Sequence, residues 1–311
     1  MLTLDKSDIQ ANLPYPELID GLRSAFKQNP EIPARQHLRI PSSGGTPATL
    51  LLMPAWNHSY VGVKIASVYP ENGPKGLPAI DAIYVLKSGE TGETLAILDG
   101  AEITRIRTAA TSALASSYLS RPDSQTLLMV GAGALAVPLI RAHSHIRNFS
   151  KVQIWNRSER GIDNVKSELG NEMEVQHVTD LNEATAGADV ISCATLSSTP
   201  LVRREYVRQG THVDLVGAYL PSMRESDAAL ISTSSVFVDT RAGACVEGGD
   251  LVLAALEASF KMSDVKAELS ELCQEGHPGR ESNSEVTVFK SVGASIEDLV
   301  AASIVFNGFT K

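Results

Sequence analysis

The stretch that decides the fold runs Leu127-Leu128-Met129-Val130-Gly131-Ala132-Gly133-Ala134-Leu135-Ala136, an apolar run followed by a glycine-rich turn. This order predicts a buried strand that turns directly into a helix. Gly131 permits the tight turn, Gly133 lets the backbone approach a pyrophosphate, and the small Ala136 allows close helix packing. The pattern therefore predicts a dinucleotide phosphate at the amino end of this helix, with Gly131, Gly133, Ala134 and Leu135 among its contacts.

The end of the next apolar run indicates which dinucleotide binds. Residues 152–155 form that run, about 20 residues beyond the glycine turn, where an acidic residue would bind the ribose 2′-hydroxyl of NAD. This chain has Asn156-Arg157-Ser158 there instead. A guanidinium and a hydroxyl suit a 2′-phosphate, so these three residues favour NADPH as the cofactor, with NADH possible.

Composition and charge limit the class of protein. A chain of 311 residues with 43% hydrophobic and 20% charged residues suits a globular protein of two domains. The net charge of -9 argues against nucleic acid or an anionic membrane as the main partner. Without a long apolar run or a signal-type start, we expect a cytoplasmic protein. Cys193, Cys245 and Cys273 lack CxxC spacing, so we expect reduced thiols and no metal site.

The order of apolar segments predicts the architecture. From about residue 127 to 240, short strands alternate with helical stretches, as in an α/β Rossmann-type doubly wound parallel sheet. Residues 1 to about 115 instead predict a helix at 15–28 and a mixed sheet. The expected strands are 49–53, 60–67, 79–86, 94–98, 127–130, 152–155, 189–194, 212–216, 236–238 and 286–290. The other expected helices are 102–120, 134–145, 161–169, 181–186 and 295–306.

Three cations outside the nucleotide-binding pattern are candidates for substrate binding: Arg35, Lys64 and Arg107. Lys64 interrupts the apolar run 61–65. A lysine that faced inward there would need an anionic partner, but strand alternation equally allows it to face solvent. Arg107 competes with Arg105 for the inward role, and Arg35 competes with Arg39.

Six separated motifs together resemble the ornithine cyclodeaminase/mu-crystallin family, and the resemblance covers essentially the whole chain. They are Gly62-Val63-Lys64, Lys75-Gly76-Leu77-Pro78, Ile106-Arg107-Thr108-Ala109-Ala110, Gly131-Ala132-Gly133, Val216-Gly217-Ala218 and Val288-Phe289-Lys290-Ser291-Val292-Gly293. The resemblance implies a homodimer whose subunit has a Rossmann NADP-binding domain, here 119–288. An α+β substrate-binding and dimerisation domain would comprise 1–118 and 289–311.

The resemblance also implies roles for the three cations. Arg107 and Lys64 would be catalytic residues that grip the substrate carboxylate or the neighbourhood of its nitrogen, and Arg35 would help to bind the carboxylate. After Val216-Gly217 the cyclodeaminase branch has Gly-Asp, whereas this chain has Ala218-Tyr219. A phenol with a pKa near 10 cannot replace that aspartate as a base, so we place Tyr219 among the substrate-binding residues.

This departure favours a resemblance to the reductases of Δ1-pyrroline-2-carboxylate and Δ1-piperideine-2-carboxylate. We therefore expect an NAD(P)H-dependent oxidoreductase acting on a C=N bond of a small cyclic imino acid, with L-proline or L-pipecolate as product. The nicotinamide would lie near Ala194, Thr195, Val216 and Gly217, at the carboxyl ends of later strands, and Lys64 would protonate the ring nitrogen. Open alternatives are a cyclodeaminase, an alanine-type dehydrogenase, and a non-catalytic crystallin-like protein that binds NADPH and a small ligand.

Three further segments carry weaker signals. Gly248-Gly249-Asp250 is typical of a helix N-cap with an acidic first turn, rather than of a functional turn. Residues 275–284 are typical of a solvated loop. Asp298 could face the active site, as the resemblance implies, or lie on a solvated helix face.

Overall fold

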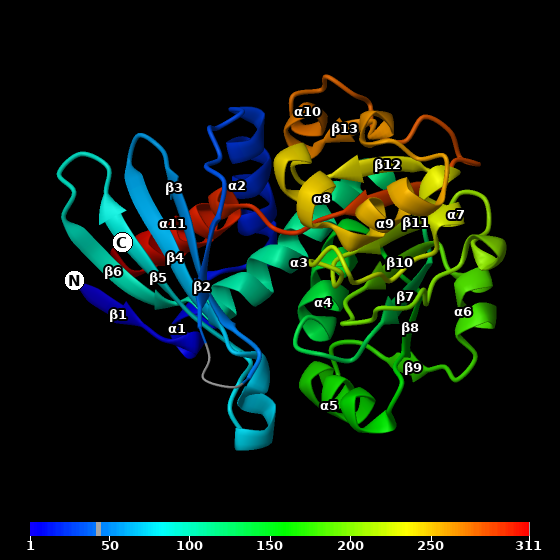
Figure 1. The fold of residues 1–311 in the computed structure, drawn as a ribbon, viewed down its shortest axis with the longest axis horizontal. Helices are drawn as coiled ribbons and strands as arrows, with labels where there is room; N and C mark the ends of the chain where they lie inside the picture. Colours follow the sequence, from blue (N-terminus) through cyan, green and yellow to red (C-terminus); the bar gives the residue numbers. More distant parts are fainter. Residues whose placement is uncertain (42–44, 311) are drawn as a thin grey trace. The chain divides into compact units, whose positions relative to one another are not determined.

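The computed structural model describes residues 1–41 and 45–310, which divide into two compact units (Figure 1). Unit 1 comprises residues 1–25, residues 29–108 and the C-terminal segment from Ala294 onward. Unit 2 comprises residues 26–28 and 109–293. Helix α3 (Gly100–Leu119) contributes its first turns to unit 1 and its remainder to unit 2.

Unit 1 is built on a six-stranded mixed sheet with the order β1-β6-β5-β4-β3-β2, in which only the β1–β6 pair is parallel among the described strands. The mixed sheet predicted from the sequence is thereby confirmed, although β1 and β2 lie outside the predicted strands. The strands are β1 (Leu2–Leu4), β2 (Gln36–Ile40), β3 (Ala48–Trp56), β4 (Tyr60–Val68), β5 (Ile80–Ser88) and β6 (Thr94–Asp99). The helices are α1 (Lys6–Asn12), α2 (Tyr15–Lys27), the 3-10 helix η1 (Pro70–Lys75) and α11 (Ser295–Thr310).

The two faces of this sheet have different surroundings because side chains alternate along each strand. Helix α11 packs against β3, β4 and β5 (Figure 1), and the face beneath it is buried at Met53, Lys64 and Tyr84. The opposite face is also apolar, yet Val61 is 38% exposed and Ile83 is 43% exposed. The sheet therefore has one covered face and one apolar face that is partly open within unit 1.

Unit 2 contains an eight-stranded sheet with the order β13-β12-β14-β11-β10-β7-β8-β9, and every described pair in it is parallel. The strands are β7 (Thr126–Val130), β8 (Lys151–Trp155), β9 (Val175–His177), β10 (Val190–Cys193), β11 (His212–Leu215), β12 (Ser235–Val238), β13 (Ala267–Glu268) and β14 (Thr287–Lys290). The helices are α4 (Ala136–Ile146), α5 (Glu159–Leu169), α6 (Leu181–Gly187), α7 (Ala228–Ser232), α8 (Arg241–Glu247), α9 (Gly249–Glu257) and α10 (Leu269–Cys273), with 3-10 helices η2 (Arg204–Tyr206) and η3 (Met262–Asp264).

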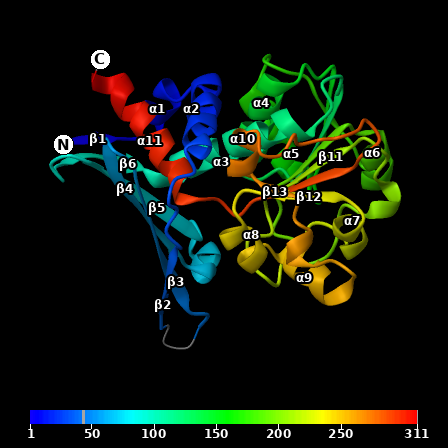
Figure 2. The same ribbon diagram turned by 90° about the horizontal axis from the view of Figure 1, so that it is seen from above.

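Helices cover both faces of this sheet, as a parallel sheet requires. On one face, alternate strand residues such as Leu128 and Val213 pack with side chains of α6, α7 and α9. On the other face, Asp214 of β11 accepts hydrogen bonds from Ser112 of α3 and lies 3.2 Å from His143 of α4. Figure 2 shows α4 and α9 on opposite sides of the strands. The Rossmann-type doubly wound sheet predicted from the apolar runs is confirmed.

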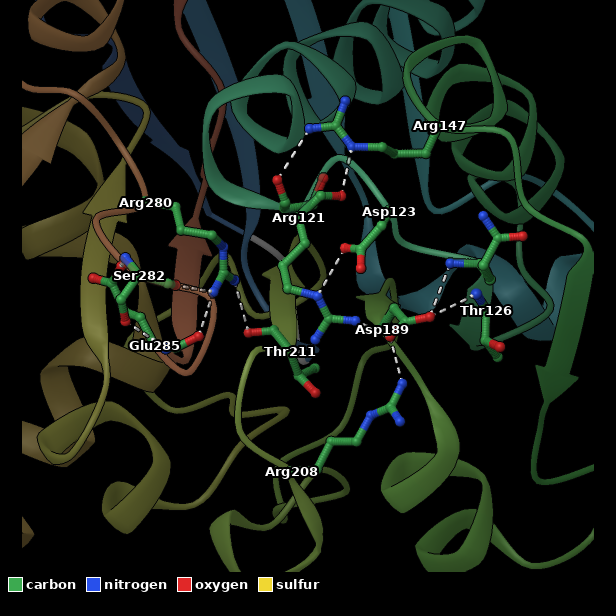
Figure 3. A network of polar contacts seen from close by, with 12 residues as sticks. Arg121, Asp123, Thr126, Arg147, Asp189, Arg208, Thr211, Arg280, Ser282 and Glu285 are labelled. Atoms are coloured by element: carbon green, nitrogen blue, oxygen red, sulfur yellow. Dashed lines mark hydrogen bonds and ion pairs between the residues drawn. The ribbon is translucent and has the colours of Figure 1, made fainter.

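A network of arginines ties the amino ends of these strands together (Figure 3). Asp189 accepts hydrogen bonds from the backbone of Thr126 and from Arg121 and Arg208. Burial alone would raise the pKa of Asp189, but its backbone N–H donors and these two guanidinium groups lower it. Arg147 donates to Ser117 O in the last turn of α3 at 3.2 Å and to Ser120 O just beyond the helix at 3.0 Å. Its position satisfies carbonyls that a helix end leaves without an internal partner.

The segment 275–284 is a loop in which most residues are exposed, as the sequence predicted. Within this loop, Arg280 reaches inward and donates to Leu119 O at 2.7 Å and to Thr287 Oγ1 at 3.0 Å. Figure 3 shows its guanidinium beside Thr211, whose carbonyl oxygen accepts a hydrogen bond at 3.3 Å. Glu285 O accepts a further hydrogen bond from this guanidinium. The loop therefore carries a structural anchor.

The described part of the chain contains no helix long and apolar enough to span a membrane.

Candidate active site

A cleft of about 290 Å³ lies at the carboxyl ends of β7, β8 and β10 in unit 2. The strand order reverses between β7 and β10, which is where doubly wound sheets bind their ligands. The lining residues are Gly131, Ala132, Gly133, Trp155, Asn156, Arg157, Ala194, Thr195, Leu196, Ser197 and Leu201. Six residues predicted for the cofactor thus come together here, while Ala134, Leu135, Ser158, Val216 and Gly217 do not line this cleft.

The glycine turn leaves room for a phosphate group. Gly131 has a φ of +108°, and a Cβ there would lie 2.7 Å from Ala194 O. A side chain at this position would therefore be strained and would also clash. At Gly133, no described heavy atom lies within 4 Å of the position a Cβ would take. Because α4 begins just beyond, at Ala136 rather than at the predicted Ala134, the backbone amides of the turn fit a pyrophosphate.

The segment after β8 is tied to this turn. Asn156 Oδ1 accepts a hydrogen bond from Ala132 N at 3.2 Å, and Asn156 Nδ2 donates to Ser158 O at 2.8 Å. Arg157 is exposed and lines the cleft. None of the described lining residues is acidic, so this segment offers a guanidinium rather than a carboxylate to a ribose.

A buried carboxylate that sequence reasoning missed joins the ends of β10 and β11. Glu225 Oε1 accepts from Thr195 N at 2.6 Å and from Thr195 Oγ1 at 2.8 Å, and Oε2 accepts from Gly217 N at 2.7 Å. Burial raises the pKa of Glu225 to about 7, against the lowering effect of Lys290. The sequence shows Glu225 only as one acidic residue in a polar stretch, without a signal that it points inward.

Tyr219 lies on the same loop as Glu225 and is partly buried. Burial raises the pKa of its phenol above the ordinary value. The shift is opposite to the one a general base near neutral pH would need, which agrees with the argument from the sequence.

In unit 1, Lys64 of β4 and Arg107 of α3 meet two carboxylates from the first turn of α11. Lys64 Nζ lies 2.9 Å from Asp298 Oδ1, and Arg107 Nε lies 3.0 Å from the same oxygen. Arg107 Nη1 donates to Glu297 Oε2 at 2.6 Å. All four side chains are at most 5% exposed. We call these four residues the ion cluster.

The ion cluster resolves three alternatives that the sequence left open. Lys64 faces inward, because only 4% of the residue is exposed. Arg107 is the buried arginine of its helix, whereas Arg105 is partly exposed and pairs with Glu102 at 2.7 Å. Asp298 is fully buried and does not lie on a solvated helix face.

Charge balance sets the protonation states of the ion cluster. Burial lowers the pKa of Lys64 to about 8, since the attraction of Asp298 only partly offsets the cost of desolvation. Burial would raise the pKa of Asp298, but Lys64 and Arg107 lower it below its ordinary value. Burial would likewise lower the pKa of Arg107, but Asp298 and Glu297 raise it. Lys64 is therefore the member that can release a proton near neutral pH.

Arg35 adds positive charge to this neighbourhood. It is partly buried, whereas Arg39 is exposed, and its charge further lowers the pKa of Lys64. The ion cluster contains two cations and two carboxylates, so it is balanced by itself. A guanidinium at this place beside the ion cluster is a suitable group for binding a small carboxylate.

Tyr84 is a second residue that sequence reasoning missed. It is fully buried and pairs across the sheet with Lys64, and its hydroxyl has no hydrogen-bond partner among the described residues. Burial, followed by the charge of Asp298, raises its pKa well above the ordinary value. A Cβ on Gly62 would lie 2.1 Å from this hydroxyl oxygen. Gly62 therefore leaves the space that the phenol fills.

The parallel sheet, the glycine turn and the cleft define a Rossmann-type dinucleotide-binding unit. Reductases among its relatives identify the class of protein as a nicotinamide-dinucleotide-dependent oxidoreductase. The model of the ornithine cyclodeaminase/mu-crystallin family matches residues 2–311, and the chain belongs to this family.

Named relatives agree with this assignment. The chain is 35% identical to a Delta(1)-pyrroline-2-carboxylate reductase of Colwellia psychrerythraea, over 97% of each chain. The solved structure of Thermococcus litoralis Delta(1)-pyrroline-2-carboxylate reductase, in complex with NADH and L-proline, is 31% identical with a TM-score of 0.93, covering 100% of this chain and 98% of that one. An archaeal alanine dehydrogenase dimer with bound NAD is 27% identical with a TM-score of 0.91, covering 100% of this chain and 96% of that one.

Proposed function

We propose that the protein is a reductase of cyclic ketimine carboxylates that converts Δ1-pyrroline-2-carboxylate into L-proline and accepts the six-membered Δ1-piperideine-2-carboxylate. The observation that carries this proposal is Lys64, a buried ammonium held 2.9 Å from Asp298 with a pKa of about 8. Such a group can donate a proton to a ring nitrogen near neutral pH. The reductase from Colwellia psychrerythraea and its relative from Thermococcus litoralis support the choice of substrate.

In this proposal unit 1 binds the substrate. Arg107 and Arg35 bind the carboxylate, because guanidinium groups offer directional paired hydrogen bonds to a planar anion. Lys64 transfers its proton to the imine nitrogen, and Asp298 keeps the ammonium form available before that transfer. A bound reduced nicotinamide would supply the hydride for C2 of the ring. Together the hydride and the proton convert the imine into the amine.

Unit 2 binds the dinucleotide in this proposal, and NADPH is the preferred form. Arg157 at the cleft provides a guanidinium for a 2′-phosphate, and Ser158 follows it in the chain. The solved relatives contain NADH or NAD, so the preference requires its own test. Replacing Arg157 with alanine should raise the KM for NADPH by about tenfold and change the KM for NADH little, because only NADPH has the phosphate. An equal change in both constants would refute the preference.

We also propose that the protein is a cytoplasmic homodimer. The partly open face of the unit 1 sheet presents Trp56, Val61 and Ile83, which are 42%, 38% and 43% exposed. A contiguous apolar sheet face of this kind is typical of a subunit interface. The archaeal alanine dehydrogenase is itself a dimer. Light scattering should give twice the subunit mass for the wild-type chain, and Val61→Glu should shift it toward the monomer.

The first experiment is an activity assay on the purified protein. Consumption of NADPH, and separately of NADH, is followed with Δ1-pyrroline-2-carboxylate, and proline formation is confirmed by amino-acid analysis. L-Ornithine with NAD⁺ and pyruvate with NADH and ammonia are run beside it. Imine-dependent oxidation of the cofactor, faster than either comparison, is the expected result.

Each other outcome identifies a rival. Proline formed from ornithine would indicate a cyclodeaminase and overturn the argument from Tyr219. Oxidation of NADH with pyruvate and ammonia would indicate an alanine-type dehydrogenase. Binding of NADPH without turnover of any substrate would indicate a crystallin-like binding protein.

A further inference from the structure

The loop that follows β11 is held in place by a buried aspartate. Asp250, in the first turn of α9, accepts hydrogen bonds through Oδ1 from Glu225 N at 2.8 Å, Ser226 N at 2.8 Å and Ser226 Oγ at 3.1 Å. Its other oxygen lies 3.4 Å from Lys290 Nζ. The helix N-cap predicted for the turn 248–250 is confirmed, with Gly248 as the cap residue, and Asp250 also has a tertiary role that the sequence did not indicate.

Because Asp250 fixes the backbone at Glu225, the side chain of Glu225 reaches the ends of two neighbouring strands. Its carboxylate accepts three hydrogen bonds, two from Thr195 and one from Gly217 N. Thr195 follows β10 and Gly217 follows β11. A fully buried carboxylate with three donors acts as a rigid link between these two positions.

The packing around this link is tight. A Cβ on Gly217 would lie 2.0 Å from Thr195 O and 2.6 Å from Glu225 Oε1. A Cβ on Gly249, at the start of α9, would lie 2.0 Å from the carbonyl oxygen of Met223, which is on the same loop as Glu225. The missing side chains at both glycines therefore allow the loop to lie close enough for Glu225 to reach its partners.

We propose that Glu225 is a positioning residue for the nicotinamide half of the dinucleotide. This inference rests on the dinucleotide binding in the proposed function. Thr195 lines the cleft and is hydrogen-bonded to Glu225. In the segment proposed for the adenosine half, Asn156 is instead hydrogen-bonded to Ala132 N and Ser158 O. Glu225 fixes Thr195 through both its N–H and its hydroxyl, so the wall of the cleft at this end does not have to become ordered when the ring binds.

The experiment compares two ligands on the full-length protein. NADH contains the nicotinamide, and ADP-ribose contains the adenosine and the pyrophosphate but lacks it. Glu225→Gln replaces one carboxylate oxygen, an acceptor, with an amide N–H donor. The new donor would face groups of Thr195 and Gly217 that themselves donate. Titration calorimetry should show that this substitution raises the dissociation constant of NADH by about tenfold and that of ADP-ribose by less than about twofold. The first change is in line with the loss of a hydrogen bond to a charged group.

Two further variants secure the interpretation. Glu257→Gln removes an exposed carboxylate that pairs with Arg224 at 2.8 Å, and this variant should bind both ligands as the wild type does. Thr195→Val removes only the hydroxyl donor and keeps Glu225. It should reproduce the selective loss of NADH affinity, and it serves as the test if Glu225→Gln does not fold.

The pH dependence supplies a readout that a purely structural role would not give. Lys290 of β14, Asp250 of α9 and Cys193 of β10 lie near Glu225. Burial and the charge of Asp250 raise the pKa of Glu225 to about 7, against the lowering effect of Lys290. Protonation of the Glu225 carboxylate leaves one fewer acceptor for the three donors. The ratio of the affinity for NADH to the affinity for ADP-ribose should therefore fall as the pH decreases through about 7. The same ratio in Glu225→Gln should be independent of pH.

Equal weakening of both ligands in Glu225→Gln, or no weakening of either, would overturn the inference. The binding test does not require turnover. A protein that binds NADH selectively through Glu225 but leaves the imine unreduced would refute the proposed substrate and still support the role of Glu225.

Discussion

The ion cluster predicts a strong coupling between Arg107 and Glu297. Replacing Arg107 with methionine keeps most of the side-chain volume but removes the guanidinium that donates to Glu297 at 2.6 Å and to Asp298 at 3.0 Å. Both carboxylates are fully buried. After the substitution Asp298 keeps Lys64, and Glu297 keeps the hydrogen bond from Ala294 N at 3.1 Å.

The expected cost follows from these contacts. Removing one partner of a buried ion pair leaves an uncompensated charge and destabilises a protein by about 3–5 kcal/mol. Arg107→Met should therefore lower the free energy of unfolding by an amount in this range. Glu297→Gln should cost less, because Arg107 keeps Asp298. The double variant removes both the guanidinium and the charge of Glu297. Its loss of unfolding free energy should therefore be about 2 kcal/mol smaller than the sum of the losses in the two single variants.

This coupling is measured by urea unfolding, monitored by circular dichroism, of the wild type, the two single variants and the double variant. The imine reductase assay is run on the same samples. Stability should recover in the double variant relative to Arg107→Met. Activity should stay low, because the arginine that binds the carboxylate is still missing. Additive costs, or a loss below about 1 kcal/mol in Arg107→Met, would refute the buried charge balance. Full activity in the double variant would remove Arg107 from the substrate site.

Three other substitutions or conditions test the same structure. First, kcat/KM for the imine should fall as the pH rises through about 8, where Lys64 loses its proton, and a flat profile up to pH 9 would contradict this role. Second, Asp189→Asn should lower the free energy of unfolding by about 2 kcal/mol at pH 7. Because the pKa of Asp189 is lowered on folding, the wild-type advantage should be present above about pH 4 and disappear as the pH falls below it, in urea titrations at several pH values. Third, Tyr84→Phe should leave the melting temperature unchanged or raise it, because the lost hydroxyl has no described hydrogen-bond partner, and a clear decrease would show that this hydroxyl is bound.

The nucleotide-binding unit was largely predictable because its strands are buried on both faces and appear as continuous apolar runs. Residues 127–130, 152–155 and 236–238 lie within strands β7, β8 and β12. The short strands β9 and β13 were not predicted, because three and two residues are too few for a periodic signal. Strand β2 was missed because four of its five residues are exposed, so its sequence lacks an apolar face.

The candidate site was less predictable because its partners are far apart in the sequence. Lys64 and Asp298 are separated by 234 positions, so strand alternation alone could not decide which way the lysine points. Glu297 and Asp298 look like ordinary acidic residues in the first turn of a helix, which is a favourable place for them without any tertiary partner. Glu225 and Arg280 carry even less signal, since each lies in a polar stretch that is typical of a loop.

The position of β14 constrains how the chain can be synthesised and folded. This strand lies between β11 and β12, yet residues 287–290 follow both of these strands in the chain and are made after them. Until they leave the ribosome, β11 and β12 each have an unpaired edge inside what will become a continuous sheet. Such edges are open to pairing with other chains. A nascent or truncated chain that stops before residue 287 should therefore depend on chaperones, and the parallel sheet can close only after residue 290 has been translated.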